Sequence, residues 1–266
     1  MVITPKTRKS HYWNEDRFII GENYIIVIDG ATPLLKQNDF NEACWMVNYI
    51  KKNINKYQGS VLEKLAALSK QGLIDLPSKL KDEEHLPSAS LSFVEYDDEY
   101  FYAGVLGDCE VTFITNSNEI IRCFSSDLSK LDNISIKELI SVAKEKNIHL
   151  TKARPFINDT LIKHRKLINK PNGYSAFTLM ENPILNVTTF NIKKEDVKEF
   201  YVYSDGFSQS FESLKIYNSH EEMFSKSLNI EEEIKKIKEA SFLDPYCDSH
   251  PRLKKIDDIT IVKVKN

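Results

Sequence analysis

The sequence predicts an α+β fold in which two antiparallel β-sheets pack face to face and helices cover their outer faces. Short apolar segments separated by turns follow one another from residue 88 to residue 124, which is typical of an antiparallel meander. Amphipathic helical patterns come in separate blocks, at about 40–73, 135–147 and 219–240, and do not alternate singly with strands. This order is expected of an α+β sandwich. A chain of 266 residues with 41% hydrophobic content can bury the core that such a sandwich needs.

The first third of the chain predicts a pair of strands followed by two helices. The strands are expected at 18–20 and 24–28, joined at Gly21-Glu22-Asn23. The motif Ser60-Val61-Leu62-Glu63 is a capping box that opens a helix reaching about Leu73. A preceding helix is indicated by apolar residues at 3.6-residue spacing: Phe40, Ala43, Cys44, Val47, Ile50 and Ile54. The stretch 75–87 reads as a loop.

Strands dominate the remainder, interrupted by helical stretches. Strands are predicted at 90–96, 100–106, 111–115, 120–124, 174–180, 185–190, 200–204 and 259–264. Helices are expected from Ser135 to about Asn147 and from Ser219 to about Ala240, with a basic irregular stretch between 152 and 171. Since no Pro-, Gly- or Ser-rich linker and no repeat interrupts the chain, we expect one domain over 1–266.

Composition excludes several classes of function. Thirty-six basic and thirty-nine acidic residues give a net charge of −3, so no overall field attracts nucleic acid or an anionic membrane. No apolar run approaches the roughly 20 residues that span a bilayer, and Met1 to Ser10 is polar. The four scattered cysteines predict buried free thiols and a reducing compartment. We therefore expect a cytoplasmic protein, monomeric, that binds neither membrane nor nucleic acid.

Aspartates stand at the ends of four apolar runs. They are Asp29 after 25–28, Asp108 after 104–107, Asp205 after 201–204, and Asp257 just before 259–262. Strands that release carboxylates at their ends gather negative charge at one edge of a sheet. Clustered carboxylates cannot all stay ionised unless a cation lies between them, and Mg²⁺, Mn²⁺ and Ca²⁺ prefer oxygen ligands. The pattern therefore predicts a site for hard divalent ions.

Taken together, these motifs resemble those of the metal-dependent protein serine/threonine phosphatases, the PPM or type 2C family. The similar segments occur in the same order as in the family and run from end to end of the chain. They are Asn14-Glu15-Asp16-Arg17, Val27-Ile28-Asp29-Gly30, Ala103 to Asp108 with Cys109 in place of serine, Ser125-Ser126-Asp127, Tyr203-Ser204-Asp205-Gly206, and Asp257-Asp258-Ile259-Thr260. Each segment alone is weak evidence, whereas the ordered set is specific.

The resemblance implies a four-layer α/β/β/α sandwich, flanked by helix pairs, with two Mn²⁺ or Mg²⁺ ions at one end. Asp29 would bridge both ions and the Gly30 carbonyl would bind one. Glu15, Asp205 and Asp257 would complete the other shell, and Asp16 would hold water molecules bound to the ions. A hydroxide bridging the two ions would then attack the phosphorus of phosphoserine or phosphothreonine directly.

The chain departs from the family at two positions, the general acid that protonates the leaving group and the arginine that binds the substrate phosphate. Ala31-Thr32-Pro33 stands where eukaryotic members have a histidine that protonates the leaving group, which lowers the expected rate on the order of 10²–10⁴-fold unless His11 substitutes. The family's phosphate-binding arginine has no direct counterpart. Candidates are Arg8, which we prefer, Lys9, Arg17 and His11. Gln209 stands where a carboxylate is usual, which puts a third ion in doubt although Asp108 is present.

A basic segment, 152–170, falls where the resemblance places a variable flap, at about 130–172. It either receives acidic or phosphorylated peptides or is a solvated loop and helix face. The favoured function is a Mn²⁺- or Mg²⁺-dependent phosphoprotein phosphatase. The alternatives are a catalytically weak or inactive phosphatase-like regulatory protein, and a hydrolase of small phosphate esters.

Overall fold

Two antiparallel β-sheets form the centre of the computed structural model, which describes residues 1–10, 12–34, 40–81, 86–183 and 185–266. One sheet has the order β1-β11-β10-β6-β7. Its strands are β1 (Val2–Arg8), β11 (Ile259–Lys265), β10 (Val197–Tyr203), β6 (Glu110–Thr115) and β7 (Ile120–Cys123). The first and last strands of the chain therefore pair with each other, with Val2 opposite Lys265 and Arg8 opposite Ile259.

The second sheet has the order β2-β3-β4-β5-β9, with a short strand β8 that also pairs with β4. Its strands are β2 (Asp16–Ile20), β3 (Tyr24–Gly30), β4 (Ser88–Tyr96), β5 (Tyr100–Leu106), β8 (Phe177–Thr178) and β9 (Thr188–Lys193). The strands of the pairs β2–β3 and β4–β5 are joined by short turns, all neighbours in this sheet are antiparallel, and β3 is buried at every position. Continuous burial follows because side chains on both faces of this strand are covered.

A layer of side chains from the facing strands fills the space between the sheets. Aromatic rings lie at its centre: Phe101 and Phe200 have ring centroids 5.0 Å apart, and Phe113 lies 5.5 Å from Phe200. Branched residues of β3 and β11 complete this layer, among them Val27 and Val262, both 0% exposed. Burial of this apolar area is the main source of stability for the sandwich.

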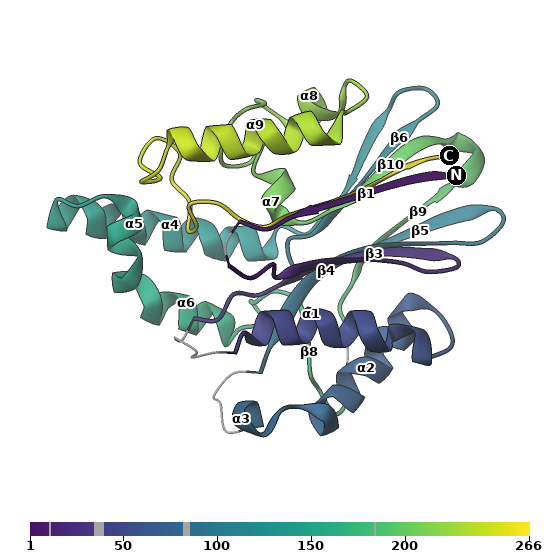
Figure 1. Ribbon diagram of the computed structural model, residues 1–266, viewed down its shortest axis with the longest axis horizontal. Helices are drawn as coiled ribbons and strands as arrows, with labels where there is room; N and C mark the ends of the chain where they lie inside the picture. Colours follow the sequence, from purple (N-terminus) through teal and green to yellow (C-terminus); the bar gives the residue numbers. More distant parts are fainter. Residues whose placement is uncertain (11, 35–39, 82–85, 184) are drawn as a thin grey trace.

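Helices cover the outer face of each sheet, which confirms the predicted four-layer α/β/β/α sandwich (Figure 1). On the β3–β4 side lie α1 (Glu42–Asn53), the 3-10 turn η1 (Ile54–Lys56), α2 (Val61–Asp75) and α3 (Ser78–Lys81). On the β10–β11 side lie α7 (Asp205–Ser208), α8 (His220–Phe224) and α9 (Ile230–Leu243). The capping box predicted for α2 is present, because Ser60 Oγ accepts from the Glu63 amide while the Glu63 side chain accepts from the Ser60 amide.

A third group of helices lies at one end of the sheets, and the two chain termini lie at the opposite end of the view (Figure 1). It comprises α4 (Asp127–Lys146), α5 (Leu150–Ala153), the 3-10 turn η2 (Arg154–Ile157) and α6 (Asn158–Arg165). A small apolar cluster of its own, with Leu139, Ala153 and Leu161, holds this group together. No helix in the described part of the chain has the length and apolar character needed to cross a bilayer.

Several element boundaries differ from the sequence-based expectations. The strand β1 was not expected, α4 begins eight residues before Ser135, and the basic stretch 152–171 contains helix α6. The helical region predicted over 219–240 divides into α8 and α9, where Asn229 takes the N-cap position of α9. The 3-10 turn η3 (Lys194–Asp196) links β9 to β10. All four cysteines are free and buried, as predicted.

Candidate metal centre

The predicted aspartates meet at the end of the sandwich beside α4 and α6. Asp29 lies near the end of β3, Asp108 in the turn after β5, Asp205 at the start of α7, and Asp257 just before β11. All four line one cavity of about 1140 Å³. Because β3 and β10 belong to different sheets, the site is built where the two layers end side by side. The strand ends therefore place these carboxylates as the sequence pattern predicted.

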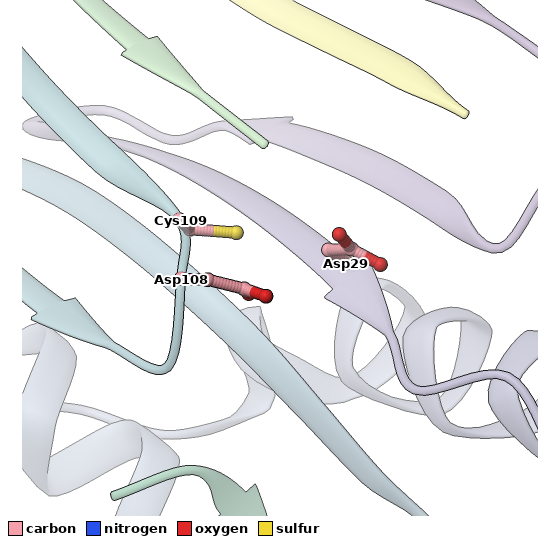
Figure 2. Close-up of side chains that lie close together, drawn as sticks. All are labelled: Asp29, Asp108 and Cys109. Carbon is pink, nitrogen blue, oxygen red and sulfur yellow. The ribbon is translucent and has the colours of Figure 1, made fainter. Parts of the chain in front are cut away.

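Asp29, Asp108 and Cys109 form the tightest group. One oxygen or sulfur atom from each lies within 4.8 Å of the others. Figure 2 shows Asp108 and Cys109 projecting from one turn toward Asp29 at the strand end. Burial, and then the charges of Asp29 and Asp108, raise the pKa of the Cys109 thiol well above its usual value. This side chain is therefore a neutral thiol beside two carboxyl groups, and the available charged donors are oxygens.

Asp16 brings a further carboxyl group from β2 to the same place. It pairs with Asp29 in the register of β2 and β3 and is 1% exposed. Its Oδ2 accepts a hydrogen bond from Ser204 Oγ at 2.7 Å, which ties β2 to the end of β10. Its Oδ1, like Oδ1 of Asp205, is buried and has no hydrogen-bond partner within the described residues. Buried carboxylate oxygens without partners are costly, so they point to a cation that binds there.

Burial and mutual repulsion raise the pKa values of Asp16, Asp29 and Asp205. Desolvation by burial is the largest cause for each of these three groups. It raises the pKa of Asp16 to about 7, with Asp257 and Asp258 adding to it. The pKa of Asp29 is raised well above its usual value by burial and then by Asp16 and Asp205, and that of Asp205 by burial and then by Asp257 and Asp108. Positive charge placed among Asp16, Asp29 and Asp205 would therefore favour their ionised forms.

Glu15 stands at the rim of the cavity and is held from two sides. Thr32 Oγ1 donates to Glu15 Oε2, and Asn41 Nδ2 donates to Glu15 Oε1 at 2.6 Å. Asn41 is also the N-cap of α1, since its Oδ1 accepts from the Cys44 amide at 2.7 Å. The backbone is fixed by Asp258, whose Oδ2 accepts from the Glu15 amide at 2.6 Å. The side chain of Glu15 thus has a defined orientation before any ligand binds.

Two glycines are required by close approaches around the cluster. A Cβ atom on Gly30 would lie 2.9 Å from Ala43 Cβ and 3.0 Å from the Glu15 carbonyl oxygen. A Cβ atom on Gly206 would lie 1.8 Å from the carbonyl oxygen of Asp258. Since backbone atoms cannot move away cheaply, any larger residue would separate the elements that carry the carboxylates. The sequence motif Asp-Gly therefore reflects packing at both positions.

Lys254 is the feature of this centre that the sequence did not predict. Its Nζ lies 2.8 Å from Oδ2 and 3.0 Å from Oδ1 of Asp257, and the side chain lines the cavity. Burial would lower the pKa of this ammonium group, but the charges of Asp257, Asp29 and Asp205 raise it well above its usual value. The cluster therefore already contains one positive charge that belongs to the chain.

The donor set fits a hard divalent ion. Asp29, Asp108, Asp205, Asp257 and Glu15 offer carboxylate oxygens around one cavity. Among them, the buried Oδ1 of Asp205 has no hydrogen-bond partner within the described residues. Such oxygen-rich sets suit Mg²⁺, Mn²⁺ and Ca²⁺ better than soft ions. Gln209 lines the cavity at the position where a carboxylate was missing from the pattern, and its buried Oε1 has no partner within the described residues.

The structure separates the candidates for a phosphate-binding group. Arg8 lies at the end of β1, half exposed, with Nη2 3.4 Å from Glu231 of α9, and is not among the described residues that line the cavity. Arg17 donates to Asn48 Oδ1 at 2.9 Å and to the carbonyl of Asn14 at 2.8 Å. His11 lies outside the described residues. Neither Arg8 nor Arg17 is therefore directed into the cavity.

Part of the basic segment does reach the cavity. Arg154, His164 and Arg165 line it, and Arg165 Nη2 donates to the carbonyl of Thr32 at 3.2 Å. Both arginines are half-buried. The predicted basic patch thus divides into residues that line the cavity and residues that face solvent. The spacing of the basic residues in the sequence could not predict which of them would line the cavity.

Comparison with known proteins identifies the fold. No sequence family and no curated protein matches the chain. Among solved structures, serine/threonine phosphatase Stp1 from Staphylococcus aureus is similar over 99% of this chain and 94% of its own, with a TM-score of 0.57 and 11% identity. The catalytic domain of serine/threonine protein phosphatase PstP, solved with two manganese ions, gives 0.57 at 12% identity over 99% and 97% of the two chains. PppA of Pseudomonas aeruginosa gives 0.57 at 11% identity over 99% and 96%.

These similarities extend over nearly the whole chain, so they concern the complete sandwich and not only one sheet. The chain therefore has the fold of the bacterial PPM-type serine/threonine phosphatases.

Proposed function

We propose that the protein is a Mn²⁺- or Mg²⁺-dependent phosphoprotein phosphatase that hydrolyses phosphoserine or phosphothreonine. The observation that carries the proposal is the convergence of carboxylates on a cavity that also has arginines on its wall. One of these carboxylates, Asp205, has a buried Oδ1 without a hydrogen-bond partner within the described residues. Carboxylates bind the ions and arginines bind a phosphate, so the cavity has both halves of a phosphate-ester site. The fold it shares with solved phosphatases supports the same function.

The residues that would hold two ions are those expected from the sequence. Asp29 would hold the ions together with the Gly30 carbonyl. Glu15, Asp205, Asp257 and Asp108 line the same cavity and would supply the other carboxylate oxygens. When bound, such ions lower the pKa of a water molecule and neutralise the charge of a phosphate ester. Asp16 is held by Ser204, and its buried Oδ1, which has no hydrogen-bond partner within the described residues, would orient water molecules bound to the ions.

Arg165 is the group that we assign to the substrate phosphate, in place of Arg8. It is half-buried, and its side chain extends from α6 to the Thr32 carbonyl at the cavity wall. A planar guanidinium matches two phosphate oxygens at once. Arg154 lies on the same wall and is held by Asn158 Oδ1 at 2.7 Å. The flap region, about 130–172, would thus supply the cationic side of the substrate site.

The leaving group receives no help from residue 31, which is an alanine on the cavity wall. Esters with good leaving groups should therefore react faster than alkyl phosphates, whose departure needs a proton. His164 and His250 also line the cavity. A catalytically weak phosphatase-like regulatory protein is the second candidate, and the Lys254 ammonium among the metal ligands is the observation that favours it.

Hydrolysis of p-nitrophenyl phosphate tests the proposal. We expect turnover that requires Mn²⁺, stops in EDTA and is lost in Asp29→Asn. Asp98→Asn serves as the matched control, because Asp98 is an exposed turn residue outside the cavity. Phosphoserine and phosphothreonine peptides then separate a protein phosphatase from a hydrolase of small esters. A folded protein that binds Mn²⁺ without turnover would support the regulatory alternative, and a protein that binds no divalent ion would refute the site.

We further propose that the chain acts as a single domain, 1–266, as a cytoplasmic monomer whose partner is a phosphorylated protein. The balanced charge of −3 and the absence of a recognisable nucleic-acid-binding motif in the sequence disfavour nucleic acid as a partner.

A further inference from the structure

The carboxylate cluster contains a positively charged side chain that the metal ions would have to displace. Lys254 Nζ lies within 3.0 Å of both oxygens of Asp257, so it occupies the face of that carboxylate toward the cavity. Asp257 is only 8% exposed. A divalent ion and an ammonium group cannot both approach the same two oxygens closely, because they repel each other.

The position of Lys254 is determined by the loop that carries it. Arg252, 5% exposed, donates from Nη1 to Asp244 Oδ2 at 2.7 Å and from Nε to the Lys255 carbonyl at 3.1 Å. Its Nη2 donates to the same Lys255 carbonyl at 3.0 Å and to the Asp244 carbonyl at 3.0 Å. The backbone directly after Lys254 is therefore fixed by a buried ion pair, and the lysine enters the cavity from a preorganised loop.

Lys255, the next residue, does not share the environment of Lys254. Lys255 is exposed, its Nζ lies 5.8 Å from the centre of the Phe242 ring, and it is not among the described residues that line the cavity. Lys254 is partly exposed and pairs with Asp257, whereas Lys255 is exposed and lies near Phe242. Lys254 is the one that faces Asp29, Asp205 and Asp257, and their charges favour its ionised form.

We propose that Lys254 is a resident counter-ion of the metal centre, which stabilises the metal-free protein by pairing with Asp257 and competes with a divalent ion for the same oxygens. The inference rests on the proposed function, since it concerns the same carboxylates. Two effects of opposite sign follow. Lys254 makes the empty centre more stable and makes the ions bind more weakly, so that loading of the site follows the free concentration of Mn²⁺.

Calorimetric titration with Mn²⁺ tests the competition. Removing the charge in Lys254→Met should lower the dissociation constant about tenfold or more, because the ion no longer displaces a cation. Lys255→Met is the matched control and should bind as the wild type does. Lys254→Arg keeps the charge and should bind no more tightly than the wild type.

Thermal unfolding provides a second readout, which a merely structural role would not reproduce. In EDTA, Lys254→Met should have a lower melting temperature than the wild type. The substitution removes Lys254, the only cationic side chain among the described cavity residues that forms an ion pair with Asp257. In saturating Mn²⁺ the difference should shrink or reverse. If Lys254→Met does not fold in EDTA, Lys254→Gln, which can still donate a hydrogen bond, is measured in the same way.

Three outcomes decide between the inference and the proposed function. Unchanged or weaker Mn²⁺ binding by Lys254→Met overturns the inference, and turnover by the wild type would leave the proposed function standing. An equal gain in Lys255→Met also overturns it, since a general charge effect would then suffice. Tighter binding by Lys254→Met, with no turnover in any variant, supports the inference and refutes the proposed catalysis.

Discussion

Replacing Asp29 with asparagine should stabilise the metal-free protein and abolish its stabilisation by Mn²⁺. The ligand atoms of Asp29 and Asp108 lie within 4.8 Å of each other, and Asp29 is 8% exposed. Two unit charges at that separation repel by about 3 kcal/mol at an effective dielectric constant of ~20. Partial protonation, reflected in the raised pKa of both groups, relieves some of this cost. Asparagine keeps the shape and removes the charge, so we expect a gain of about 1–3 kcal/mol in EDTA.

The wild type should be more stable than Asp29→Asn when metal is present. A ligand at one hundred times its dissociation constant stabilises the folded state by about 2.7 kcal/mol. The variant, which lacks the central ligand, should gain much less. Urea unfolding at neutral pH in EDTA and in saturating Mn²⁺ should therefore show the two stability orders crossing. Asp98→Asn should follow the wild type under both conditions.

Either of two results would contradict this prediction. A variant less stable than the wild type in EDTA would show that the clustered charges do not destabilise the metal-free fold. A variant that gains as much from Mn²⁺ as the wild type would show that Asp29 is not a ligand.

Three further changes test other parts of the structure. His220 is 4% exposed, and burial followed by the charge of Arg122 lowers its pKa to about 4. As the pH falls, the unfolded chain therefore takes up a proton on His220 before the folded protein does, and the free energy of unfolding should fall by up to roughly 3 kcal/mol from pH 6.5 to 4. Urea unfolding of His220→Gln should depend less on pH over this range, and the same pH dependence as in the wild type would contradict this role of His220. Asp258→Asn should cost about 1–3 kcal/mol in urea unfolding, because Asp258 accepts from the amides of Ser10 and Glu15; a neutral effect would count against it. Arg165→Met should raise KM for p-nitrophenyl phosphate about tenfold with Mn²⁺ affinity unchanged, whereas Lys163→Met, on the same helix, should not; equal KM values would remove Arg165 from the substrate site.

The fold could be predicted where local signals agree with tertiary packing. The hairpin around Gly21 and the meander after Ser88 have apolar segments bounded by turns, and both formed at nearly the expected positions. The strand β1 escaped because it is an edge strand with alternating exposure that contains Pro5, Lys6 and Arg8. The backbone of β1 forms its hydrogen bonds with β11, at the other end of the sequence. A pattern of neighbouring residues cannot reveal a pairing between segments so far apart.

The site could be predicted only in its acidic half. Aspartates at strand ends are visible in the sequence because a strand fixes where its last side chain lies. The cationic half depends on how irregular segments fold. Arg165 reaches the cavity because α6 forms within a basic stretch, and Lys254 differs from Lys255 only through the loop that Arg252 holds. Nothing in the local pattern distinguishes those two lysines.

The two halves of the site also have opposite energetic roles. The carboxylates cost stability, as their raised pKa values show, and the fold tolerates them because apolar layers lie on both sides of β3. Those layers include residues such as Ile28 and Val27, both fully buried next to Asp29. A centre supported by so rigid a framework cannot relieve its repulsion by moving apart. It can do so by taking up protons, by pairing with Lys254, or by binding divalent ions. On the proposed function, we therefore expect competition among these three sources of positive charge to determine how far the centre is loaded with metal at a given pH and Mn²⁺ concentration.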